Sequence, residues 1–147
     1  MSIDLRSNSL DNLTASSFLF EFLKKRISAH EYAKSIVDRI NKYEKVLKAW
    51  VCFDLNDLLK NAKKIDNNRK LYKNMPLVGV PVGIKDIFNT TNFPTRFGSN
   101  IKYNINPGND ARVVTSLKNS GALIVGKTTT SEFGVHSRPI TKNPHNF

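Results

Sequence analysis

The chain has 147 residues, enough for one domain with a buried core, and its net charge of +11 invites comparison with nucleic-acid-binding proteins. Its lysines are spread over several segments, without an arginine-rich stripe or interleaved aromatic residues, so the charge does not indicate a specific nucleic-acid site. The single cysteine excludes an intrachain disulfide, and the apolar segment 17–23 is too short to cross a membrane, so we expect a cytoplasmic protein. The cysteine and the three histidines lack the spacing of a metal site, and we expect neither a metal nor a cofactor.

Two helices are predicted in the N-terminal part of the chain. Thr14 is expected to start the first helix, because apolar side chains recur after it at helical spacing. These side chains are Phe18, Leu19, Phe22 and Leu23. The residues from Ser28 to Glu31 have the pattern of a capping box, which predicts the start of the second helix. Its expected core face consists of Tyr32, Ala33, Ile36, Val37 and Ile40.

An extended segment, a third helix and a strand are predicted next. Apolar residues alternate with other residues from Leu47 to Phe53, which favours an extended segment. The third helix is expected to place one set of side chains in the core, namely Leu55, Leu58, Leu59, Ala62 and Ile65. Residues 78–84 predict a buried strand, in which Pro81 requires an edge position or a bulge because it lacks an N–H group.

Lys85 follows this apolar strand directly and is the first candidate for a functional residue. Burial disfavours the ammonium form of a lysine, which is how a lysine becomes a base near neutral pH. The alternative is a lysine at a strand end whose amine reaches solvent. Asp86 could pair with the amine and keep it charged, but adjacent strand residues face opposite sides, so we expect Asp86 to point away.

A loop, a helix and another strand are predicted downstream. Residues 91–108 are rich in Asn, Pro and Gly and have no sustained period, which indicates a long loop, with room for a short helix. Asp110 is expected to cap a helix that ends at Gly121. The apolar face of this helix is Val113, Val114 and Leu117. The strand, helix and strand between residues 78 and 125 predict a parallel crossover in an α/β sheet.

The segment 121–128 also matches the pattern GxxxxGK[ST] of phosphate-binding loops. In such a loop the four middle residues form a turn whose N–H groups face the phosphates. Here the four residues are Ala-Leu-Ile-Val, which form the predicted strand itself, so we do not expect a nucleotide site.

Several blocks of this sequence resemble, in order and spacing, the N-terminal part of the amidase signature family, enzymes that hydrolyse carboxylic amides. The blocks are 75–95, Gly98-Ser99, Asp110-Ala111, 121–128, 131–134 and 143–146. The resemblance is dense from 76 to 147 and looser from 10 to 66. It implies an α/β fold of which this chain is the N-terminal portion, an incomplete domain with helices followed by the β-α-β start of a mixed sheet. Residues 1–75 would be a mostly helical lead-in, and residues 76–147 would be the start of the catalytic core.

In that family a serine, a cis-serine and a lysine carry out the reaction, and the resemblance assigns the lysine to Lys85. The two serines belong to a Gly- and Ser-rich stretch and to a later segment, which would follow Phe147. Five serines of this chain lie outside such a setting, so none of them is expected to substitute: Ser16, Ser17, Ser99, Ser131 and Ser137. We therefore expect this chain alone to be inactive, because its base has neither a nucleophile nor an oxyanion hole.

Other polar residues are weaker candidates. Thr128, Thr129 and Ser131 follow the second strand of the crossover, where loops often line a cleft, and the resemblance places this region near the active site. The alternative for each hydroxyl is a helix cap or a turn, and many relatives have Asn where Thr129 stands. His136 and His145 are expected to be loop residues, because no paired acid accompanies them.

Two functional hypotheses remain. In the first, the chain is part of an amidase that acts on a small-molecule amide, or part of the A-type subunit of an aminoacyl-tRNA amidotransferase. Such a subunit would contact nucleic acid only indirectly, through a tRNA-dependent complex. In the second, the chain is a non-catalytic binding protein or a relic of an amidase. We expect no membrane partner, and we expect exposed sheet surface to promote self-association.

Overall fold

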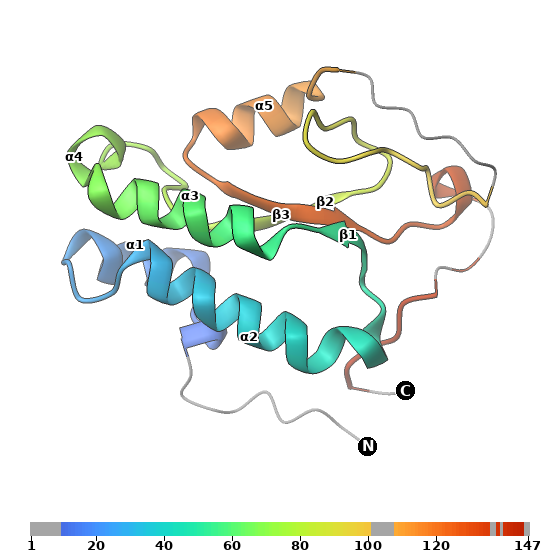
Figure 1. Cartoon of the computed structure of the whole chain (residues 1–147), viewed down its shortest axis with the longest axis horizontal. Helices are drawn as coiled ribbons and strands as arrows, with labels where there is room; N and C mark the ends of the chain where they lie inside the picture. The colour runs from blue at the N-terminus through green and yellow to red at the C-terminus, as the bar shows by residue number, and fades with distance from the viewer. Residues whose placement is uncertain (1–9, 101–107, 136–137, 139, 146–147) are drawn as a thin grey trace.

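A computed structural model describes residues 10–100, 108–135, 138 and 140–145 (Figure 1). The helices are α1 (Ala15–Leu23), α2 (Ala29–Leu47), α3 (Leu55–Asn67), α4 (Arg69–Tyr72) and α5 (Arg112–Asn119), and short 3-10 helices span Leu10–Asn12 and Glu132–Gly134. The strands are β1 (Trp50–Phe53), β2 (Pro81–Lys85) and β3 (Leu123–Thr128). This order confirms the predicted helices followed by a β-α-β unit. The extended segment before α3 is shorter than predicted, because α2 continues to Leu47.

Local hydrogen bonds explain where the first two helices begin. The hydroxyl of Thr14 accepts from the N–H of Ser17 at 3.1 Å, so Thr14 is the N-cap of α1, as predicted. Ser28 and Glu31 form the predicted capping box, with each side chain accepting from the backbone N–H of the other. The prediction of the apolar face of α1 is wrong for one residue, because Leu23 is 57% exposed.

The three strands form one mixed sheet in the order β1-β3-β2. β1 is antiparallel to β3, and β2 is parallel to β3, so α5 is the predicted crossover helix. Pro81 opens β2 at an edge of the described sheet, and the register between β2 and β3 shifts after Val82. A proline N atom has no hydrogen to donate to a ladder, which is why an edge position or a bulge was predicted here, and the structure has both an edge position and a register shift.

The main core lies between the N-terminal helices and the sheet (Figure 1). Phe18 is fully buried, and its ring stacks on that of Tyr32 with centroids 4.2 Å apart. The other buried members are Phe22, Ala29, Ala33, Ile40, Leu58, Ala62, Ile65, Val78, Val80, Leu123 and Val125. Apolar burial of this extent is the main source of stability of such a fold.

The start of α5 differs from the prediction. Ala111 is its N-cap, and no side chain caps the helix. Asp110 instead accepts from the N–H of Thr91 at 2.8 Å and pairs with the amine of Lys118 at 2.6 Å, so it ties the long loop to the helix. Val113 is exposed rather than buried, whereas Gly121 ends the helix with φ of +88°, as predicted. Residues 91–100 contain no helix, and 101–107 lie outside the described residues.

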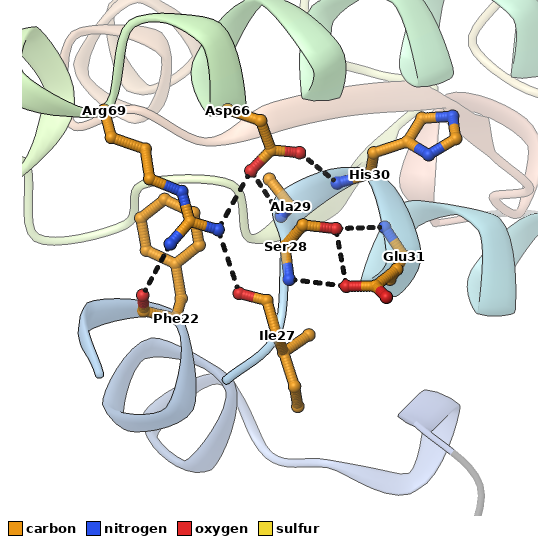
Figure 2. Close-up of polar contacts among 8 residues, drawn as sticks. All are labelled: Phe22, Ile27, Ser28, Ala29, His30, Glu31, Asp66 and Arg69. Atoms are coloured by element: carbon orange, nitrogen blue, oxygen red, sulfur yellow. Dashed lines mark hydrogen bonds and ion pairs between the residues drawn. The ribbon is translucent and has the colours of Figure 1, made fainter. Parts of the chain in front are cut away.

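A polar clamp joins the N-terminal helices to α3 and α4 (Figure 2). The carboxylate of Asp66 accepts from the N–H groups of Ala29 and His30 at the start of α2, each at 2.9 Å. The guanidinium of Arg69 donates to Asp66 at 3.2 Å and to the carbonyl oxygens of Phe22 and Ile27 at 3.1 Å each. The clamp therefore satisfies N–H groups that a helix leaves unpaired at its first turn, and it fixes the α1–α2 corner against α3. No helix within the described ranges is long and apolar enough to cross a membrane.

Candidate active site

Lys85 is the last residue of β2 and lies opposite Thr128 of β3 in the ladder. Its side chain is exposed, while its neighbours Ile84 and Asp86 are buried. Successive strand side chains point to opposite faces of the sheet, so the burial of both neighbours places Lys85 on the other face, which we call the open face. The expectation of a buried amine is therefore wrong for the described chain, and the alternative, an amine that reaches solvent, is what the structure has.

Asp86 points away from Lys85, as expected, and pairs with a different lysine. One carboxylate oxygen of Asp86 lies 3.2 Å from the amine of Lys127, and both side chains are completely buried. The amine of Lys127 also donates to the hydroxyl of Thr95 at 2.8 Å and to the carbonyl oxygen of Pro94 at 3.3 Å. Both carboxylate oxygens of Asp86 accept from the N–H of Arg96 at 3.3 Å. The buried charges are thus paired and hydrogen-bonded, as a buried ion pair requires.

The role of Lys127 is not among the predictions from the sequence. The prediction places this residue only in the strand that occupies the GxxxxGK[ST] segment, and β3 confirms that strand. The available signal was the strand period: Leu123, Val125 and Lys127 are alternate residues, and the first two are apolar. All three are buried, so the third requires a buried countercharge, which Asp86 supplies.

The residues after β3 lie beside a cavity of about 460 Å³. Among the described residues its lining includes Asp86, Arg96, Ser99, Thr129 and Thr130, with Arg138 at the C-terminal side. The hydroxyl of Thr130 is buried and has no hydrogen-bond partner within the described residues. Thr129 lines this cavity, and its N–H donates to the carbonyl oxygen of Ala49 at 2.9 Å.

The other two predicted cleft residues lie elsewhere. Thr128 is in the β3 ladder opposite Lys85, and its Cγ2 would lie 2.7 Å from a Cβ atom added at Gly83. This close approach explains why the open face of β2 has a glycine there. Ser131 is the N-cap position of the short helix Glu132–Gly134, without a side-chain capping bond. Both are half-buried.

Two loops that flank the cavity are tied together. The N–H of Phe133 donates to the carbonyl oxygen of Phe97 at 2.8 Å, and the hydroxyl of Ser99 donates to the carboxylate of Glu132 at 2.7 Å. Gly98 adopts φ of +64°, and a Cβ atom there would lie 2.6 Å from the carbonyl oxygen of Thr130. The hydroxyl of Ser99 is therefore part of the contact between the two loops.

The remaining candidates do not form a second site among the described residues. His145 is exposed, and its N–H donates to the side chain of Asn143, while His136 and Ser137 lie outside the described residues. Burial raises the pKa of the Cys52 thiol, which opposes its use as a thiolate. No group of three His, Cys, Asp or Glu side chains within the described ranges could hold a metal ion.

Comparison with protein families supports one assignment. The family model described as Amidase matches residues 31–146. Two similar curated proteins are the A-type subunits of glutamyl-tRNA(Gln) amidotransferase from Desulfatibacillum aliphaticivorans and from Gloeothece citriformis. The first is 33% identical over 92% of this chain and 29% of its own length. The second is 36% identical over 84% of this chain and 27% of its own length. The chain therefore spans less than a third of the length of these relatives.

Solved structures show the same fold. The peptide amidase of Stenotrophomonas maltophilia superposes with a TM-score of 0.72 and 24% identity, over 88% of this chain and 26% of the enzyme. An amidase family protein of Bacillus anthracis has a TM-score of 0.73 and 26% identity, over 84% of this chain and 25% of its own. The described helices and mixed sheet thus correspond to about a quarter of each solved chain.

Proposed function

The chain belongs to the amidase family, and on this premise we propose that it supplies the lysine base of an amide-hydrolysing site, with Lys85 as that base. The position of Lys85 carries the proposal: it lies within the matched residues 31–146, at the carboxyl end of β2, with an exposed side chain. The neighbouring carboxylate of Asp86 is paired with Lys127 on the buried side, so it does not bind the amine of Lys85.

The proposed reaction follows the Ser-cisSer-Lys scheme. In the proposed whole domain, further segments would cover Lys85 and disfavour its ammonium form, and the neutral amine would then take a proton, through a relay serine, from a nucleophilic serine that attacks the amide carbonyl. Within the described residues the amine of Lys85 has no hydrogen bond or ion pair, so it is available to such a hydroxyl. We propose that both serines and the oxyanion donors belong to segments like those that the longer relatives contain outside the aligned part. The 147-residue chain alone would then be inactive.

We propose that residues 1–147 are the N-terminal part of a single amidase domain, with 1–75 as the mostly helical lead-in and 76–147 as the start of the catalytic core. The substrate would be a small carboxylic amide, and the protein would work in the cytoplasm.

A specific observation favours a second candidate, the A-type component of a tRNA-dependent amidotransferase, because both relatives described above carry that name. The third candidate, a non-catalytic binding protein that associates through its sheet edges, predicts no hydrolysis in any context.

A chimera tests the proposal. Residues 1–147 replace the aligned segment of the Desulfatibacillum relative, and ammonia release is measured with a panel of small primary amides. We expect hydrolysis, and we expect Lys85→Ala to lower kcat/KM by about 10²-fold or more. Lys73→Ala, which removes another exposed lysine, is the control and should retain activity. An inactive chimera, or an unimpaired Lys85→Ala chimera, would contradict the proposal.

A further inference from the structure

The buried pair of Asp86 and Lys127 lies directly behind the proposed base. Asp86 follows Lys85 in the chain, and the two side chains lie on opposite faces of the sheet. We infer that this ion pair is a positioning device for Lys85: it locks the end of β2 so that the amine is presented on the open face. The inference rests on the function proposed above, and it assigns Asp86 and Lys127 a role in that function without contact with substrate.

Backbone hydrogen bonds transmit the position of Asp86 to Lys85. The N–H of Asp86 donates to the carbonyl oxygen of Thr128 at 3.0 Å, which continues the β2–β3 ladder one residue beyond Lys85. The carbonyl oxygen of Asp86 accepts from the N–H of Phe97, and that of Lys85 accepts from the N–H of Phe88, each at 3.0 Å. The peptide group between Lys85 and Asp86 is therefore held at both ends, and the Cα–Cβ direction of Lys85 is fixed with it.

The pair holds the loop as well as the strand. The three N–H bonds of the Lys127 ammonium correspond to three oxygen partners, on Asp86, Thr95 and Pro94. The hydroxyl of Thr95 in turn donates to the carbonyl oxygen of Phe88 at 3.2 Å. Because hydrogen bonds are directional and an apolar contact is not, this arrangement fixes orientation in a way that two apolar side chains of the same size would not.

The pair also separates charges. A carboxylate that follows the base in sequence would hold a nearby amine in its ammonium form if the two side chains met. Here Lys127 neutralises Asp86 on the buried side. The same two residues thus orient the base and keep the adjacent carboxylate away from it.

The test uses the 147-residue chain and amide hydrogen exchange measured by NMR. The double variant Asp86→Asn/Lys127→Met removes both charges and nearly preserves side-chain size. We expect protection of the amides at positions 86, 88 and 97 to fall about tenfold or more, and that of α2 to stay within about twofold. We also expect the side-chain signals of Lys85 to shift, while those of Lys73 stay in place. The matched control is Asp110→Asn/Lys118→Met, which neutralises a different close ion pair and should leave positions 86, 88 and 97 unchanged.

Two results would overturn the inference. An equal loss of protection at all amides would mean that the pair only stabilises the fold, because amides that exchange through global unfolding change together. Unchanged protection and unchanged Lys85 signals would mean that the pair does not hold the base. If the double variant does not fold, Thr95→Val removes one oxygen partner of Lys127 without removing a charge, and the same criteria apply. Hydrolysis is not measured here, so this inference can fail while the chimera still shows Lys85 to be the base.

Discussion

The amine of Lys127 lies 3.2 Å from a carboxylate oxygen of Asp86, and neither side chain has any solvent exposure. Lys85, one residue before Asp86, is exposed instead. The chain therefore contains a buried lysine in β3 with a structural countercharge and, on the opposite face of the sheet, an exposed lysine at the end of β2. Of these two lysines, only Lys85 has an amine without a hydrogen bond or ion pair among the described residues, and it is the one that we propose as the base.

The first prediction concerns the cost of breaking the buried pair. Lys127→Met leaves the Asp86 carboxylate buried without a countercharge, so the free energy of unfolding should fall by about 3–5 kcal/mol. Asp86→Asn/Lys127→Met should regain much of that loss, because it leaves no unpaired charge. Urea unfolding measures both, with Lys73→Met as the control, expected to change by less than about 0.5 kcal/mol. Equal stability of Lys127→Met and Lys73→Met would refute the assigned burial.

Chemical labelling distinguishes the two lysines directly. In the native chain an acylating reagent should modify Lys85 at a rate similar to that of exposed lysines such as Lys73, because its side chain is open to solvent. Lys127 should remain unmodified until the chain is unfolded, since its amine is fully buried. Mass spectrometry of peptides from native and denatured samples gives both rates. Modification of Lys127 in the native state at the rate of Lys73 would contradict the structure.

Local sequence patterns predicted most of the fold. The capping box at Ser28 and Glu31 depends on residues three apart, and the stop at Gly121 depends on one residue, so both are visible in sequence. Asp110 was predicted to be an N-cap from the same kind of signal, but Thr91 and Lys118 compete for its carboxylate. Those partners lie 19 and 8 residues away, which a local rule does not consider.

The candidate site was less predictable for the same reason. Lys85 could be selected from its place at a strand end and from the family resemblance, but the sequence did not determine whether it was buried. Its exposure depends on the face of the sheet on which it lies. The buried side of this strand end has Asp86, whose partner Lys127 is 41 positions further along the sequence and meets it only across the β2–β3 ladder. Buried ion pairs of this kind follow from tertiary structure.

A further prediction concerns the clamp between α2 and α3. Asp66→Asn removes the charge that accepts from Ala29, His30 and Arg69, so the free energy of unfolding should fall by about 1–3 kcal/mol. Asp38→Asn, at an exposed position of α2, should change it by less than about 0.5 kcal/mol. The two variants are compared by urea unfolding. A loss no greater in Asp66→Asn than in Asp38→Asn would show that the clamp adds nothing to stability.

Asp110 gives a pH-dependent contribution to stability. Although burial raises its pKa, hydrogen bonds from Lys118 and Thr91 outweigh burial and lower the pKa below its usual value. A lowered carboxyl pKa stabilises the fold above the unfolded-state pKa, near 4, and the contribution is lost as pH falls through the folded-state value. The stability advantage of the native chain over Asp110→Asn should therefore be larger at about pH 6 than at about pH 2 to 3. An advantage that does not change with pH would contradict this account.

The identity of Lys85 as a base is tested most directly by Lys85→Arg in the active chimera. Arginine keeps the positive charge and nearly the length of the side chain, but it does not give up its proton at neutral pH. If Lys85 is the base, Lys85→Arg should lower kcat/KM about 10²-fold or more, as Lys85→Ala does. If only a positive charge is needed at this position, Lys85→Arg would keep activity within a few fold of the unmodified chimera, and the central claim would be wrong.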